Sequence, residues 1–134
     1  MPFIHLQFAP APGVRVDDAA LAQTLTRLAA ELLHKKPEVT AVRLEAVEPA
    51  AWFIGGESLA ARSQAGAQLQ IQVTAGTNPA EEKARFVGAA FDALATRLGA
   101  PHPASYVVVD EIAADAWGYG GRTQAARRVT TAAR

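Results

Sequence analysis

The sequence of 134 residues contains no cysteine, which excludes disulfides, zinc–thiolate sites and a cysteine nucleophile. It also has no excess of either charge, because 13 Lys and Arg balance 13 Asp and Glu, so no basic surface indicates nucleic acid. No apolar run approaches the roughly 20 residues of a membrane span, and the start does not have the pattern of a signal peptide. The histidines do not have metal-ligand spacing. We therefore expect a cytoplasmic protein of one domain that binds no metal, cofactor, nucleic acid or membrane.

One stretch of the sequence occurs twice. Residues 52–62 read WFIGGESLAAR and residues 117–127 read WGYGGRTQAAR, so both follow the pattern W-x-x-G-G-x-[ST]-x-A-A-R. The two copies lie about 65 residues apart, close to half the chain. Such a period predicts a duplicated fold, with unit one at residues 1–62, a linker at 63–66 and unit two at 67–128. The paired glycines are explained by the positive φ angles of a tight turn.

Each unit has the same predicted order of elements. An alternating strand begins it (PFIHLQF in unit one, QLQIQV in unit two), and an amphipathic helix follows. The helical stripes are Leu21, Leu25, Leu28 and Leu32 in unit one, and Val87, Ala90, Phe91, Leu94 and Leu98 in unit two. Expected N-caps are Asp17 or Asp18 for the first helix and Thr77 or Asn78 for the second. A second strand closes each unit, at residues 40–47 and 105–112.

This order predicts an α+β two-layer fold. Each strand–helix–strand crossover should be parallel and right-handed, and the two units can join their sheets edge to edge. The result is one four-stranded sheet with both helices on one face. The other face carries polar residues that either meet solvent or lie at the centre of an oligomer, the reading we favour: His5, Gln7, Gln68, Gln70 and Gln72. Residues 129–134 are predicted to form a frayed or partner-contacting tail.

The arrangement resembles the tautomerase superfamily, specifically 4-oxalocrotonate tautomerase. The resemblance rests on Met1-Pro2 directly before an alternating strand, a glycine near the strand's end (Gly13 or Gly76), a strand that carries Arg43, and the closing turn WFIGGE. It covers nearly the whole chain. It implies a tautomerase/MIF-like fold made of two fused units, which in the longer family members form trimers.

The resemblance also implies a site. Pro2, exposed when Met1 is removed, would be the general base and acid, and an apolar pocket with nearby cations would bring its pKa towards neutral. Arg43 would bind and polarise the carboxylate of a small substrate, and Arg15 takes the place of the family's other arginine through a longer loop. Trp52 and Trp117 match the aromatic residue that lines the pocket, with Trp117 expected near Pro2 and Trp52 near the site of unit two.

Unit two departs from the family pattern. It has Ala67 in place of Pro2, Thr77 after Gly76, and no arginine in residues 105–112, which implies one active site per chain. The expected function is a cofactor-free tautomerase acting on unsaturated 2-hydroxy or 2-keto acids. Two alternatives remain open: a non-catalytic binding or scaffold protein, and a hydratase, dehalogenase or decarboxylase that uses the same proline. If Met1 stays attached, the Pro2 nitrogen is a tertiary amide and cannot act as a base.

Overall fold

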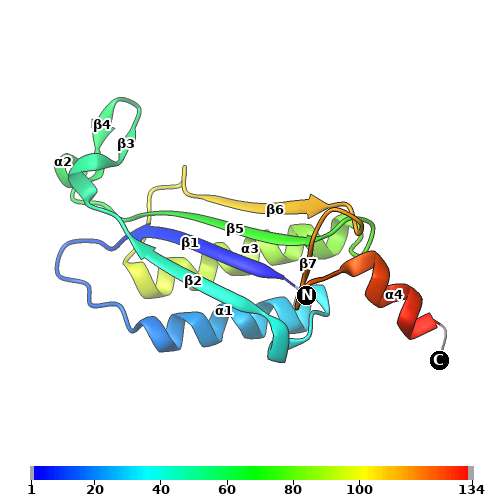
Figure 1. The fold of residues 1–134 in the computed structure, drawn as a ribbon. Helices are drawn as coiled ribbons and strands as arrows, with labels where there is room; N and C mark the ends of the chain where they lie inside the picture. The colour runs from blue at the N-terminus through cyan, green and yellow to red at the C-terminus, as the bar shows by residue number, and fades with distance from the viewer. Residues whose placement is uncertain (1, 133–134) are drawn as a thin grey trace.

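The computed structural model describes the backbone of residues 2–132 and the side chains of residues 2–128. Its centre is a four-stranded sheet in the order β2-β1-β5-β6 (Figure 1). β1 (Phe3–Ala9) pairs in parallel with β2 (Ala41–Ala46), and β5 (Gly66–Thr74) pairs in parallel with β6 (Tyr106–Ile112). The two pairs join through an antiparallel β1–β5 contact in which Ile4 faces Ile71 and Leu6 faces Leu69. The predicted sheet of two joined strand–helix–strand units is thus confirmed.

Helices α1 (Asp18–Leu33) and α3 (Ala80–Leu98) lie side by side on one face of the sheet (Figure 1). The alternate residues of β1 and β5 that face the helices are fully buried, and they form the core with one stripe from each helix. In α1 the stripe is Leu21, Leu25, Ala29 and Leu33, with Leu28 and Leu32 packed at its margin. In α3 it is Phe86, Ala90, Leu94 and Leu98.

Two local predictions for the second helix are wrong. Phe86 is the buried aromatic, whereas Val87 is 38% exposed, because residues spaced by four from Leu98 face the sheet. Neither Thr77 nor Asn78 caps the helix: Pro79 is the N-cap residue, and the Asn78 amide instead donates to Leu33 O at 2.9 Å, joining α3 to the end of α1. Asp17 does cap α1, since its carboxylate accepts from Ala20 N at 3.1 Å.

The remaining elements are short. They are the 3₁₀ turns η1 (Pro37–Val39) and η2 (Pro49–Ala51), the strands β3 (Phe53–Ile54), β4 (Glu57–Ser58), β7 (Gly118–Tyr119) and β8 (Arg122–Thr123), and the helices α2 (Leu59–Arg62) and α4 (Gln124–Ala132). Helix α4 includes residues 129–132 of the predicted tail, so their backbone is helical, and residues 133–134 lie outside the described part. β5 begins at Gly66, the last residue of the predicted linker.

The repeated motif forms a β-hairpin followed by a helical turn in each half. Its glycine pair supplies the two positive φ angles of the turn, 61° and 78° at Gly55 and Gly56 and 62° and 79° at Gly120 and Gly121. Ser58 and Thr123 accept hydrogen bonds from the first helical turn, from Ala61 N and Ala126 N. The final arginine folds back onto the hairpin: Arg62 donates to Ile54 O at 3.1 Å and Arg127 to Tyr119 O at 2.7 Å.

The face of the sheet opposite the helices carries paired polar side chains. His5 bonds Glu45 at 3.0 Å, and Gln70, at the corresponding position of the second half, donates to Asp110 at 3.0 Å. The hydrogen bond from His5, with one from Gln7, lowers the pKa of the Glu45 carboxyl below its usual value. Phe3, Tyr106 and Val108 add exposed apolar area to the same face. No helix of the described residues is long and apolar enough to cross a membrane.

Candidate active site

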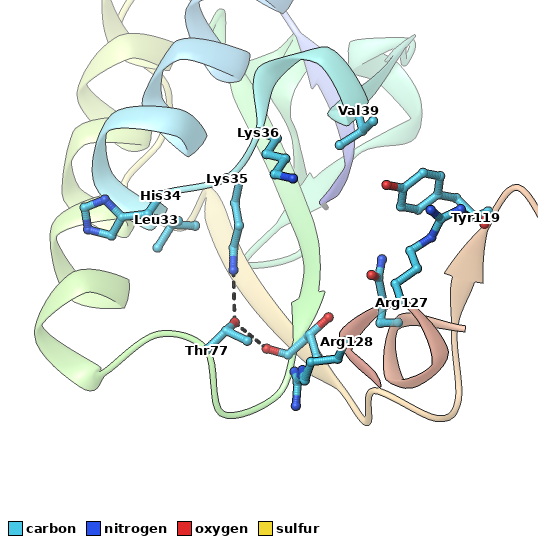
Figure 2. Close-up of a pocket in the computed structure, with 11 residues that line it drawn as sticks. Leu33, His34, Lys35, Lys36, Val39, Thr77, Tyr119, Arg127 and Arg128 are labelled. Carbon is cyan, nitrogen blue, oxygen red and sulfur yellow. Dashed lines mark hydrogen bonds between the residues drawn. The ribbon is translucent and has the colours of Figure 1, made fainter. Parts of the chain in front are cut away.

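The sheet has a cavity at the end where β1 begins. Its volume is about 450 Å³, and it lies between the C-terminal turn of α1, the end of β5 and the β7–β8 hairpin with α4 (Figure 2). Cationic side chains from two directions line it: Lys35 and Lys36 after α1, and Arg127 and Arg128 from α4. Leu33 and Val39 provide apolar wall, and Thr74, Thr77 and Gln124 provide neutral polar groups. Such a lining suits a small organic anion.

Pro2 lies beside this cavity and is buried. Its carbonyl accepts from Ala41 N at 3.2 Å, two residues after the lining residue Val39. In the β1–β5 register Phe3 pairs with Gln72, which places Pro2 opposite Val73 and next to Thr74, another lining residue. Figure 1 shows the start of β1 next to β7. Pro2 itself does not line the cavity, and Met1 lies outside the described residues.

Lys35 is held in the cavity by a chain of hydrogen bonds. Its ammonium donates to the Thr77 hydroxyl at 2.9 Å, as Figure 2 shows, and that hydroxyl is 2.6 Å from Thr74 O. Burial lowers the pKa of Lys35 below its usual value, and the nearby Glu82 carboxylate offsets part of this effect. Glu82 bonds both Asn78 (3.0 Å) and His34 (2.7 Å), and these bonds lower the pKa of the Glu82 carboxyl. Lys35 is therefore a partly desolvated, oriented cation.

On the opposite wall, Arg127 is oriented by Tyr119. Its guanidinium carbon lies 3.7 Å from the centre of the Tyr119 ring, in addition to the bond to Tyr119 O. Both residues belong to the repeated motif, so the same turn that shapes the hairpin also places a cation at the cavity (Figure 2). Arg62, the corresponding arginine of the first half, does not line this cavity.

The opposite end of the sheet, where Ala67 replaces Pro2, also has a cavity, but of different chemistry. It measures about 550 Å³ and has no charged lining residue; its walls include Trp52, Phe53 and Tyr106. A shift of 65 positions pairs Lys35 with Ala100, Lys36 with Pro101 and Gln124 with Leu59. Of the four cationic lining residues, Lys35, Lys36 and Arg128 thus have no cationic counterpart in the other half, whereas Arg127 corresponds to Arg62.

The two tryptophans lie at opposite ends of the sheet. Trp117 Nε1 donates to Thr74 Oγ1 at 3.2 Å, which places the indole at the Pro2 end, behind a lining residue of the cationic cavity. Trp52 shares the uncharged cavity with Gln68, next to Ala67. This is the arrangement that the family resemblance implies, although Trp117 does not itself line the cationic cavity.

The structure does not bring the two predicted arginines into this cavity within one chain. Arg43 is exposed on the helix-free face, opposite His5 in the β1–β2 register, in a small hollow of about 160 Å³ with Phe3 and Gln72. Arg15 is exposed in the loop between β1 and α1, which leaves β1 at the end opposite Pro2. Their roles stay predictions, and each would require a neighbouring chain.

Comparisons with known proteins agree with this architecture. Residues 69–127 match the family model described as tautomerase enzyme. A solved structure of native fused 4-OT superposes with a TM-score of 0.78 at 23% identity, over 92% of this chain and 97% of that one. The second half of the chain thus matches the tautomerase family, and the chain as a whole has the fold of fused 4-OT proteins.

Two further solved structures share the tautomerase fold. The F6 fused 4-OT wild-type asymmetric trimer has a TM-score of 0.76 at 21% identity, over 92% of this chain and 98% of that one. Pt0534 inactivated by 2-oxo-3-pentynoate has a TM-score of 0.79 at 12% identity, over 93% and 98%. No curated protein sequence matches the chain. The family model matches the second half of the chain, which has Ala67 at the position that corresponds to Pro2.

Sequence reasoning missed most residues of the cationic cavity. In the sequence, the position of Lys35 and Lys36 after a helix is explained by the favourable interaction of cations with the C-terminal end of the helix dipole. Arg127 is the final residue of the repeated motif, which gives it no separate signal. The signal that could have found them is the comparison of the halves position by position, because Lys35/Ala100 and Gln124/Leu59 are among their sharpest chemical differences. Among the described residues, no group of three or more His, Cys, Asp or Glu could hold a metal ion.

Proposed function

We propose that this protein is a cofactor-independent tautomerase that interconverts the enol and keto forms of small unsaturated 2-hydroxy and 2-keto carboxylates. The observation that carries the proposal is the difference between the two ends of the sheet. The end with Pro2 has a cavity lined by four Lys and Arg side chains, whereas the end with Ala67 has an uncharged one. A carboxylate would be attracted to the first cavity alone.

Pro2 would move the proton at carbon. Once Met1 is removed, its nitrogen would be a secondary amine, and the burial of Pro2 and the cations of the cavity would both disfavour its charged form. In ketonisation the proline ammonium gives a proton to carbon 3, while the enol oxygen loses its proton to water. The reverse reaction runs through the same groups. A base whose pKa is near the working pH is the most effective for such transfers.

Lys35 would bind the substrate carboxylate, with Arg127 on the opposite wall. Both are oriented by other contacts, Lys35 by Thr77 and Arg127 by Tyr119, so little side-chain freedom is lost on binding. Arg43 lies on the helix-free face, where another chain can approach. Similar fused 4-OT proteins are described as trimers, and we propose a homotrimer that packs through this face, in which Arg43 serves a neighbouring chain's site.

The test is a phenylpyruvate assay on protein of known N-terminus. Phenylpyruvate requires little beyond the base, and loss of its enol absorbance follows ketonisation. Protein whose intact mass shows loss of one methionine should accelerate the reaction, and protein that retains Met1 should not, because its Pro2 nitrogen is an amide. Equal activity of the two forms, or none in either, would contradict the proposal and leave the non-catalytic alternative.

A further inference from the structure

One position of the repeated motif is apolar in the first half and polar in the second, where its side chain lines the cationic cavity. Leu59 follows the N-cap Ser58 in the first half, and Gln124 follows Thr123 in the second. Leu59 is fully buried and lies over the residue before Ala67, since a Cβ added to Gly66 would come within 2.6 Å of Leu59 Cδ1. Leu59 therefore fills the space next to Gly66, the residue that precedes Ala67.

The backbone around Gln124 is held as it is around Leu59. Leu59 N donates to Trp52 O at 2.9 Å, and Gln124 N donates to Trp117 O at the same distance. The hydroxyl before each residue accepts from the following helical turn, Ser58 from Ala61 N and Thr123 from Ala126 N. Because the local geometry repeats, the Gln124 side chain should stand over the nitrogen side of Pro2, as Leu59 stands over the residue before Ala67. Gln124 is accordingly a lining residue of the cationic cavity.

We propose that Gln124 is a specificity-determining residue, whose side-chain amide binds the oxygen on carbon 2 of the substrate. This inference rests on the proposed function, because it concerns the same cavity. An amide is both donor and acceptor: its NH₂ donates to a keto oxygen, and its carbonyl accepts from an enol hydroxyl. The NH₂ group would also stabilise the negative charge that develops on this oxygen when carbon 3 is deprotonated.

The other lining residues are less suited to this oxygen. The Lys and Arg side chains match the carboxylate, which is the charged group of the substrate. The Thr77 hydroxyl accepts from the Lys35 ammonium at 2.9 Å, which places it at the carboxylate-binding side of the cavity. Leu33 and Val39 are apolar. A side chain over the amine side of Pro2 would lie near carbon 3, the carbon that Pro2 would protonate, and therefore near carbon 2.

A binding experiment tests this without requiring turnover. The probes are 3-phenyllactate and 3-phenylpropionate, which share the carboxylate and the ring and differ in the 2-hydroxyl group. Titration calorimetry on the protein without Met1 should show about fivefold tighter binding of 3-phenyllactate, the value of one neutral hydrogen bond. Gln124→Met keeps the length of the side chain and should bring the two affinities within about twofold of each other while leaving 3-phenylpropionate binding nearly unchanged.

Two further variants keep the test decisive. Gln124→Leu reproduces the first half and should weaken both ligands, whereas Gln64→Met, a Gln-to-Met change outside the cavity lining, should alter neither. Thermal unfolding of each variant checks the fold. Equal binding of the two probes by the wild-type protein, absence of binding, or an undiminished preference in Gln124→Met would overturn the inference. If the protein binds 3-phenyllactate selectively but does not ketonise phenylpyruvate, the proposed function is contradicted while the inference about Gln124 stands.

Discussion

Pro2→Ala should lower kcat/KM for phenylpyruvate ketonisation by about 100-fold or more, the usual contribution of a positioned general acid or base. The variant still has an N-terminal amine after Met1 is removed, but it is a primary amine without the pyrrolidine ring that packs at the start of β1. Its pKa and its position relative to carbon 3 should both change. The measurement is the decay of enol absorbance, on protein whose mass confirms removal of Met1.

Pro12→Ala is the matched control for this variant. Pro12 is exposed in the loop between β1 and α1, at the end of the sheet opposite Pro2. This change should leave kcat/KM within about twofold of the wild-type value, as expected for a surface position. If Pro2→Ala stays within the same range, Pro2 is not the group that moves the proton.

Lys35→Ala should raise KM for phenylpyruvate by about 10- to 100-fold, with a smaller effect on kcat. A hydrogen bond to a charged group contributes about 1.5–3 kcal/mol, and Lys35 is held in the cavity by Thr77 at 2.9 Å. The change also converts the position to the alanine that the second half has at Ala100. Lys35→Arg, which keeps the charge, should restore most of the affinity.

The pH dependence of KM separates a role in binding from a role in stability. Because burial lowers the pKa of Lys35, its charge is lost at a lower pH than that of an ordinary lysine, so KM should rise as pH increases through this lowered pKa. This rise should be absent in Lys35→Arg. Lys83→Ala is the control, since Lys83 pairs with Glu111 at 2.8 Å outside the cavity. Equal KM changes in Lys35→Ala and Lys83→Ala would contradict the carboxylate role.

The sheet and its helices could be predicted because the same strand and helix patterns occur in both halves of the sequence. Alternation in residues 3–8 and 68–73 fixed which side chains face the helices, and the spacing of the W-x-x-G-G copies gave the duplication. The positive φ angles at the glycine pairs and the hydroxyl caps at Ser58 and Thr123 explain why the motif recurs. These features depend on local chemistry, which a single sequence records well.

The cationic cavity could not be predicted in the same way. Lys35, Thr77 and Arg127 come from three separate elements, and only the antiparallel joining of β1 and β5 brings these elements to one end of the sheet. Lysines after a helix are also typical of ordinary dipole compensation, so Lys35 has no distinctive local pattern. Phe86 was missed for a related reason, because two adjacent apolar residues leave the phase of a helix open.

The central claim is that each chain has one reactive amine, at Pro2. 2-Oxo-3-pentynoate tests it directly: it is a 2-keto acid with an electrophilic triple bond, and a solved structure with this fold is of a protein inactivated by it. After incubation and digestion, mass spectrometry should find one adduct per chain, on the peptide that begins at Pro2, and excess phenylpyruvate should slow its formation. An adduct on Lys35, several adducts per chain, or none on protein without Met1 would contradict the account.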